Sequence, residues 1–267
     1  MAPPRCFLIY VICLLCCLAA CTSQPIAVTR EPVTLSLVVA DSCAPLVERL
    51  VTAYAEARPW VTIQVQVFDT SVAERMLRAG EVDVALLSWT WEMTYEEPLW
   101  AATFAHDGIA VIAHPGVTFS ETGLAHLQDV FRGRIQEWGG VVLVVVTRES
   151  GSGTRAAFER AVLGFHRTTH NAVVMPSGEA VVEYVARTPG AIGYVSTLHL
   201  SDSAVSRVRV LPVEGVLPTG EAITNGEYPI SRPLRVATVT EPTGEAREFA
   251  QWLLNLPERV FGGVGTE

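Results

Sequence analysis

Seven residues that begin at Arg148, with the sequence RESGSGT, hold the side chains best suited to bind a ligand. They follow the apolar run 141–147, and a helix-like pattern begins at Gly153, so they occupy a junction between a strand and a helix. Free N–H groups and the dipole at a helix start attract anions. Gly153 lets the backbone approach a ligand, Ser152 and Thr154 offer hydroxyl donors, and Arg148 offers a planar fork. This combination predicts a site for a tetrahedral oxyanion.

Two earlier junctions of the same kind carry similar chemistry. Asp41 and Ser42 follow the strand-like run 34–40, and Asp69 and Thr70 follow another strand-like run. Each junction alone has the ordinary composition of a helix cap. Three junctions that converge could hold an oxyanion without a lysine, and the chain has no lysine.

Charge and composition exclude several function classes. The chain of 267 residues has a formal net charge of −9, and nucleic-acid binding depends on basic residues that neutralise phosphates, so we expect no nucleic-acid partner. Lysine-dependent phosphate loops and Schiff bases are excluded, and no nucleophile elbow, dinucleotide fingerprint or triad spacing occurs. The sequence therefore favours a binding protein over an enzyme, without a cofactor.

Two further sets of side chains are weaker candidates for chemistry. His166 and His170 have the i, i+4 spacing of a metal-binding helix, but no glutamate or cysteine stands at a distance that completes a motif, so we predict no metal site. Cys43 has no histidine near it in sequence, and we expect a small buried residue rather than a nucleophile.

The N-terminus predicts export and lipid attachment. Arg5 precedes an apolar run, 7–20, that is too short to span a bilayer comfortably, and the run ends LAAC at Cys21. This pattern is similar to a bacterial lipobox, and it predicts a signal peptide at 1–20, lipidation of Cys21 and a tether at 21–33. An uncleaved anchor helix is the alternative. Both readings place the globular part outside the cytoplasm, attached to the cell membrane.

The elements that must position these residues alternate between strand-like and helix-like runs along the chain. This alternation predicts an α/β fold with two lobes, each a mainly parallel sheet flanked by helices, and a ligand cleft between the lobes. The predicted first lobe combines 34–107 with 203–267, and the predicted second lobe is 108–202.

The run RESGSGTRAAFE at 148–159 resembles the signature of the phosphate-binding proteins of bacterial high-affinity phosphate ABC importers. Further stretches are similar in order and spacing: ADSCAPL at 40–46, GEVDVA at 80–85, HDGIAVI at 106–112, FRGRIQEW at 131–138, GAIGYV at 190–195 and YPISRPL at 228–234. The resemblance covers nearly all of the expected mature chain. It implies a type II periplasmic-binding-protein fold and a monomer that delivers inorganic phosphate to the permease of an ABC transporter.

Carried over position by position, the resemblance implies ligand contacts from one group of residues: Arg148, Ser152, Gly153, Thr154 and Thr70. Two other positions depart from the family. Asp41, followed by Ser42, stands where the family often has a hydroxyl, and Ser88, followed by Trp89, stands where members often have an aspartate that accepts the proton of phosphate. Asp41 either takes over this acceptor role or caps the helix that follows it.

The departures at Asp41, Ser88 and Trp89 leave two alternatives to phosphate transport. One is a divergent anion-binding or sensory module whose ligand is not phosphate. The other is an extracytoplasmic phosphoesterase, which would require a metal cluster or an activated nucleophile that the sequence does not display.

Overall fold

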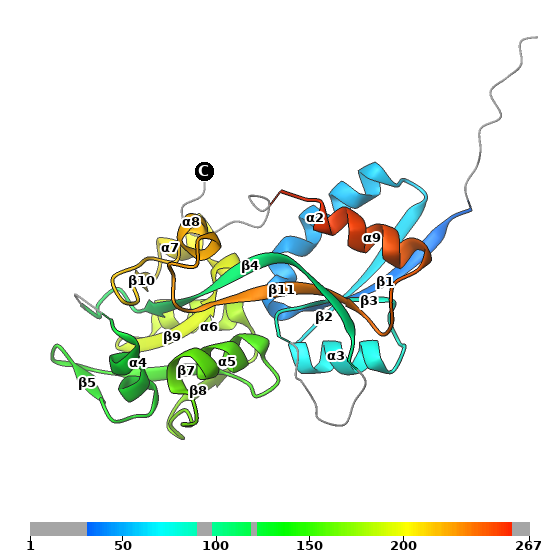
Figure 1. Ribbon diagram of the computed structural model, residues 1–267. Coiled ribbons are helices and arrows are strands. Elements are labelled where there is room, and N and C mark those ends of the chain that lie inside the picture. Colours follow the sequence, from blue (N-terminus) through cyan, green and yellow to red (C-terminus); the bar gives the residue numbers. More distant parts are fainter. Residues whose placement is uncertain (1–30, 90–97, 119–121, 258–267) are drawn as a thin grey trace, which may run out of the picture. The chain divides into compact units, whose positions relative to one another are not determined.

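The central feature of the computed structural model, which describes residues 31–89, 98–118 and 122–257, is a mixed sheet of nine strands flanked by helices (Figure 1). The strand order is β2-β1-β3-β11-β4-β9-β7-β8, and β10 pairs with β4. The α/β prediction is confirmed. The predicted signal peptide, Cys21 and nearly all of the predicted tether lie outside the described residues. None of the described helices has the length and apolarity needed to cross a bilayer.

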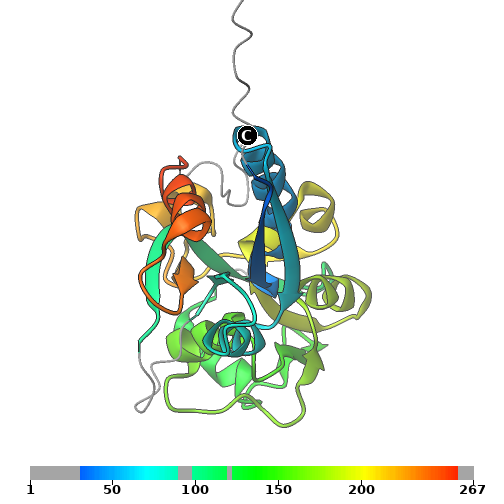
Figure 2. The same ribbon diagram turned by 90° about the vertical axis from the view of Figure 1, so that its right-hand side faces the viewer.

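The N-terminal strands form a parallel group whose inner strands are buried on both faces and whose edge strand is mostly exposed. Alternate residues of β1 enter two different apolar clusters, with Leu35, Leu37 and Val39 on one face and Val38 on the other. Helices α2 and α9 cover the first face and α3 covers the second, so they lie on opposite sides of the strands in Figure 2. The elements are β1 (Val33–Ala40), α2 (Ala44–Ala57), β2 (Val61–Phe68), α3 (Thr70–Arg78), β3 (Val84–Leu87) and α9 (Gly244–Leu254).

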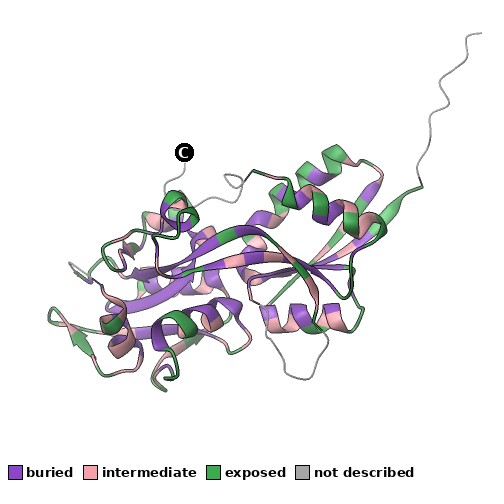
Figure 3. Cartoon of the chain, viewed as in Figure 1, coloured by how far each residue is buried: buried purple, intermediate pink, exposed green. Residues whose placement is uncertain are grey.

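A second parallel group, β7, β8 and β9, follows the same plan. All six residues of β9 are buried, and its alternate side chains Ile192 and Ala191 enter separate clusters that hold α4 and α5 in one case and α6 in the other. Figure 3 shows the strands mostly buried and the helices buried along one side. The elements are α4 (Leu124–Phe131), the hairpin β5 (Glu137–Trp138) and β6 (Val141–Val142), β7 (Val144–Arg148), α5 (Gly153–Phe158), a π-helical turn (Glu159–Leu163), β8 (Val173–Met175), α6 (Gly178–Arg187) and β9 (Ala191–Ser196).

Two long antiparallel strands, β4 (Trp100–Ala113) and β11 (Ser231–Thr238), join the parallel groups. Strand β11 pairs with β3 on one side and β4 on the other, and β4 continues to β9. Phe104 belongs to the apolar cluster of the N-terminal strands, whereas Ile109 belongs to the cluster of the second group. The chain therefore passes between the two groups within β4.

The return passage lies in β11 and not near residue 203, where the predicted first lobe resumed. The elements between β9 and β11 are a 3-10 turn (Thr197–His199), α7 (Asp202–Val205), β10 (Arg209–Leu211) and α8 (Gly220–Thr224). Strand β10 pairs with β4, and Leu211, Ile223 and Ile230 share a cluster with Ile109. Apolar side chains from residues 208–230 therefore pack with the second group. The division into two lobes itself stays a prediction.

Candidate oxyanion site

Two of the three predicted junctions meet directly. The backbone N–H of Gly153 donates to Thr70 Oγ1 at 3.2 Å, and the N–H of Ser71 donates to the carbonyl of Gly151 at 3.0 Å. A Cβ on Gly153 would lie 2.5 Å from Ser88 Oγ and 2.6 Å from Thr70 Oγ1, so only glycine allows this approach. The start of α3, the end of β3 and the start of α5 are thereby brought together.

Arg148 ends β7 and is buried, with 1% of its surface exposed. Its Nε and Nη2 donate to the two carboxylate oxygens of Glu149 at 3.1 and 2.7 Å, and its Nη1 donates to Asp41 Oδ2 at 2.7 Å. Backbone carbonyls of Met175 and Pro176 accept further hydrogen bonds. Burial alone would lower the pKa of Arg148, but Glu149 and Asp41 outweigh burial and raise it, so the guanidinium stays charged.

Asp41 does not cap the helix that follows it, which excludes one of the two predicted roles. Helix α2 has no side-chain cap, and the Asp41 carboxylate instead accepts at Oδ2 from Gly178 N, at 3.0 Å, and from Arg148. Gly178 begins α6, so this carboxylate occupies the kind of position at a helix start that suits an anion. The Asp41 carboxylate therefore links the end of β7, through Arg148, to the start of α6, through Gly178.

His199 is a neighbour of Asp41 that the sequence did not single out. Its Nε2 lies 3.2 Å from the carbonyl oxygen of Asp41 and 3.7 Å from Asp41 Oδ2. Burial lowers the pKa of His199 below its ordinary value and outweighs the opposing effect of Asp41. His199 is consequently neutral at neutral pH and adds no positive charge to the site.

The hydroxyl groups of the predicted site are arranged as donors. Thr70 Oγ1 accepts from Gly153 N, so it keeps its own hydrogen for Ser88 Oγ, 3.0 Å away, or for a ligand. Ser152 Oγ accepts from Arg155 N at 3.3 Å and caps α5, which also leaves its hydrogen free to be donated. Ser42 is buried, and its Oγ has no partner within the described part of the chain.

Thr154 contacts a charged pair that sequence reasoning missed. Its Oγ1 accepts from Arg232 Nη2 at 3.0 Å, and the same guanidinium binds Asp107 of β4. Both residues stand in stretches that carried the family resemblance, at 106–112 and 228–234. The sequence signal that could have indicated this pair is one charged residue within each apolar strand pattern, Asp107 in the first stretch and Arg232 in the second.

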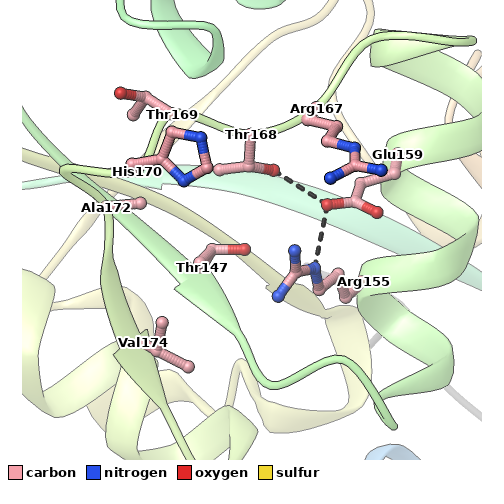
Figure 4. Close-up of a pocket in the computed structure, with 9 residues that line it drawn as sticks. All are labelled: Thr147, Arg155, Glu159, Arg167, Thr168, Thr169, His170, Ala172 and Val174. Carbon is pink, nitrogen blue, oxygen red and sulfur yellow. Dashed lines mark hydrogen bonds and ion pairs between the residues drawn. The ribbon is translucent and has the colours of Figure 1, made fainter.

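A polar pocket of about 410 Å³ opens beside α5, and Figure 4 shows the side chains around it. Arg155 and Thr168 both donate to Glu159 Oε1 at 2.8 Å. Arg155 also donates to the carbonyl of Arg148 at 2.9 Å and so connects this pocket to the strand end. The lining residues are Thr147, Arg155, Glu159, Arg167, Thr168, Thr169, His170, Ala172 and Val174.

Cys43 is confirmed as a buried residue that is not poised for nucleophilic chemistry. It is fully buried in the apolar cluster of the N-terminal strands. Burial raises the pKa of its thiol to about 12, so the reactive thiolate is not populated at neutral pH.

Known proteins share the sequence and the fold of this chain. A family model described as a PBP superfamily domain matches residues 27–255. The phosphate-binding protein PstS of Bacillus subtilis is 29% identical over 84% of this chain and 77% of its own length. PstS of Pseudomonas aeruginosa is 28% identical over 76% of this chain and 71% of its own length. A structure described as a phosphate ABC transporter substrate-binding protein with bound phosphate, from Clostridium perfringens, is 27% identical, with a TM-score of 0.77, and the match covers 85% of this chain and 95% of that one.

Proposed function

Because this chain belongs to the PBP superfamily, we propose that it is a binding protein that captures inorganic phosphate and delivers it to the permease of an ABC transporter. The observation that carries the proposal is the meeting of three strand ends, those of β1, β2 and β7, through the Asp41–Arg148 and Thr70–Gly153 contacts. Hydrogen-bond donors from a helix start, from hydroxyl groups and from a guanidinium suit a tetrahedral oxyanion. The names of the PstS relatives and of the phosphate-bound structure support phosphate as this oxyanion.

The contacts within the site also support a closing motion as the delivery mechanism. Thr70 and Asp41 belong to the N-terminal strand group, and their respective partners Gly153 and Arg148 belong to the second group. A ligand that touches both groups favours the closed arrangement over an open one, because it gains contacts only when they approach. Release of phosphate then accompanies separation of the same contacts.

Asp41 is proposed as the group that accepts the proton of the bound phosphate. Its Oδ2 already accepts from Arg148 and Gly178, whereas its Oδ1 accepts no hydrogen bond within the described residues. Ser88 cannot replace a carboxylate as a charged acceptor. A carboxylate that remains unpaired beside a fully ionised anion disfavours sulfate and so provides selectivity.

The site is tested by calorimetric titration of the purified mature chain with phosphate, sulfate and arsenate. We expect phosphate and its close analogue arsenate to bind and sulfate to bind more weakly. Arg148→Met should abolish binding, whereas Arg187→Met, which removes an exposed arginine, should leave the affinity unchanged. An absence of heat with millimolar phosphate would contradict the proposed function.

The Asp41 proposal requires its own comparison of anions. Asp41→Asn removes the charge but retains a polar side chain of similar size, so we expect it to reduce the preference for phosphate over sulfate. If the variant and the wild type discriminate equally between the two anions, Asp41 is not the acceptor.

We propose that the protein acts outside the cytoplasm as a lipid-anchored monomer without catalytic activity. Cys21, which lies outside the described residues, is the proposed lipidation site. Labelling cells with a fatty-acid probe should mark the wild type but not Cys21→Ala, and light scattering should give the mass of one chain.

Phosphatase assays with and without divalent metals should detect no turnover, and metal-dependent turnover would support the phosphoesterase alternative.

A further inference from the structure

A buried ion pair on the two joining strands lies next to the oxyanion turn. Arg232 of β11 stands opposite Asp107 of β4 in the strand register, and the two residues are 2% and 1% exposed. Arg232 Nε and Nη2 donate to Asp107 Oδ2 at 3.1 and 2.8 Å, and Asp107 Oδ1 accepts from Thr197 Oγ1 at 2.9 Å. Asp107 thus has partners on both oxygens.

Arg232, in contrast, is not fully satisfied by this pair. Its Nη1 is buried and has no hydrogen-bond partner within the described part of the chain. A guanidinium carries five N–H donors, and a buried charged donor without an acceptor costs more than a neutral one. If the ion pair served stability alone, Nη1 would be expected to have a hydrogen-bond acceptor within the protein, since buried polar groups nearly always find partners. The orphaned Nη1 indicates an acceptor that the protein itself does not supply.

The remaining contact of Arg232 connects it to the site. Its Nη2 donates to Thr154 Oγ1 at 3.0 Å, and Thr154 directly follows Gly153 at the start of α5. A guanidinium cannot accept hydrogen bonds, so the Thr154 oxygen is the acceptor and its own hydrogen is directed elsewhere. The Thr154 hydroxyl is consequently prepared to donate to an oxygen that faces the turn.

We propose that Arg232 is a second guanidinium of the oxyanion site, in addition to Arg148. Its Nη1 binds an oxygen of the anion, while its Nη2 fixes the Thr154 hydroxyl as a donor to the same anion. Both nitrogens belong to one rigid planar fork, so a ligand at Thr154 lies within reach of Nη1. This inference rests on the proposed function, because it assigns another contact to the same ligand.

The charge balance explains why an extra guanidinium is compatible with selectivity. Asp41 and Glu149 offset the charge of Arg148, and Asp107 offsets that of Arg232. The site therefore attracts an anion through directed hydrogen bonds and not through an excess of positive charge. Directed donors of this kind discriminate between anions by the geometry and the protonation state of the anion.

The test compares phosphate affinity by calorimetry in variants that separate binding from folding. Arg232→Met alone leaves the Asp107 charge buried without its partner and is expected to unfold the chain. The informative variant is therefore Arg232→Met with Asp107→Asn, which removes both charges and keeps an acceptor for Thr197. We expect this double variant to unfold cooperatively, like the wild type, and to bind phosphate about ten- to a hundred-fold more weakly.

Two further variants distinguish a ligand contact from a purely structural pair. Asp107→Asn alone leaves the buried Arg232 charge without its carboxylate, so the folded chain should be less stable without ligand and should bind phosphate more tightly, because the anion then compensates Arg232. A purely structural pair would give no increase in affinity. Arg187→Met controls for the loss of one positive charge and should bind as the wild type does. A folded double variant with wild-type affinity would overturn the inference while leaving the proposed function intact. If the wild type itself binds no phosphate, the proposed function fails first.

Discussion

The two strand groups approach each other closely at Gly153. Its missing side chain leaves room for Thr70 Oγ1 and Ser88 Oγ, which a Cβ would meet at 2.6 and 2.5 Å. The contact depends on both strand groups, because neither the Thr70 nor the Ser88 hydroxyl could remain in place beside a residue larger than glycine. Substitutions here should therefore affect folding and ligand binding together.

Gly153→Ala is predicted to lower the free energy of unfolding by about 1–3 kcal/mol, the usual cost of an overpacked site. It should also weaken phosphate binding, since Thr70 and Ser88 must move. Urea denaturation and calorimetry measure the two effects. Gly116→Ala is the control, because Gly116 is exposed and its Cβ would meet only the flexible His114 side chain, at 3.1 Å. Equal stability of both variants would contradict the packing argument.

The stability of the chain should fall as the pH is lowered from neutral, because of His199. Burial lowers its pKa in the folded chain below the value of about 6.5 that applies when it is unfolded. Between these two values only the unfolded chain binds the proton. The contribution to stability is thus complete above the unfolded pKa and is lost as the pH falls through the folded one.

Urea denaturation at several pH values between about 5 and 8 measures this dependence. His199→Gln should flatten the decline just below pH 6.5, where carboxylates remain ionised. His170→Gln is the matched control, since His170 is exposed. The same slope in wild type and His199→Gln would show that other groups cause the decline.

The parts of the site that the sequence predicted are those with a local signal. Gly153 and Thr70 stand beside strand-to-helix junctions, where capping residues and glycines follow an apolar run. Arg232 and Asp107 are separated by 125 positions along the chain, and no local pattern relates one to the other. Asp41 was predicted, but its partner at the start of α6 depends on how distant segments pack.

At the scale of elements, the helices α3, α5 and α6 around the site each begin with a side-chain cap. Asp69 precedes α3, and its Oδ1 accepts from Val72 N at 2.9 Å and from Ser71 Oγ at 2.8 Å. Thr219 caps α8 in the same way, through Ala222 N at 3.2 Å. The two caps are equivalent locally, but only α3 carries a residue of the site.

Asp69→Ala and Thr219→Ala are both predicted to lower the free energy of unfolding by about 0.5–2 kcal/mol, the range for a lost cap. Only Asp69→Ala should also weaken phosphate binding, because the first turn of α3 holds Thr70. Thermal unfolding and calorimetry on both variants separate the two effects. If Thr219→Ala weakened binding as much, general destabilisation would explain the loss.

Regular elements were predicted well where the sequence pattern was regular. The strand-like run 34–40 corresponds to β1, and the helix-like pattern that begins at Gly153 corresponds to α5. Strand β4, in contrast, runs through the position between residues 107 and 108 where the predicted lobes meet. The exposed His106 and the buried Asp107 lie in the middle of this strand, and polar residues break the apolar run by which a strand is predicted.

At the scale of the whole molecule, the sheet is continuous from β2 to β8 through β11 and β4, and residues 33–257 belong to one compact unit. Although two strand groups bury separate clusters, they share the two joining strands. Loss of either group would expose one side of β4 or β11. The groups should therefore unfold together.

We predict one cooperative unfolding transition, with far-UV circular dichroism and tryptophan fluorescence giving the same urea midpoint. Phosphate at a hundred times its dissociation constant should add about 2.7 kcal/mol to the free energy of unfolding and move both probes equally. Sulfate at the same concentration is the control. Two separate midpoints, with phosphate shifting only one, would show that the groups fold independently.

The position of β11 in the sheet has a consequence for synthesis and export. Strands β3 and β4 are neighbours of β11 rather than of each other along this path, so residues up to 230 leave the middle of the sheet unfilled. A growing chain can complete the sheet only when Ser231–Thr238 has emerged. Late, non-local pairing of this kind is slow. A chain that folds late stays extended for longer, which is the state in which a polypeptide can be threaded across a membrane.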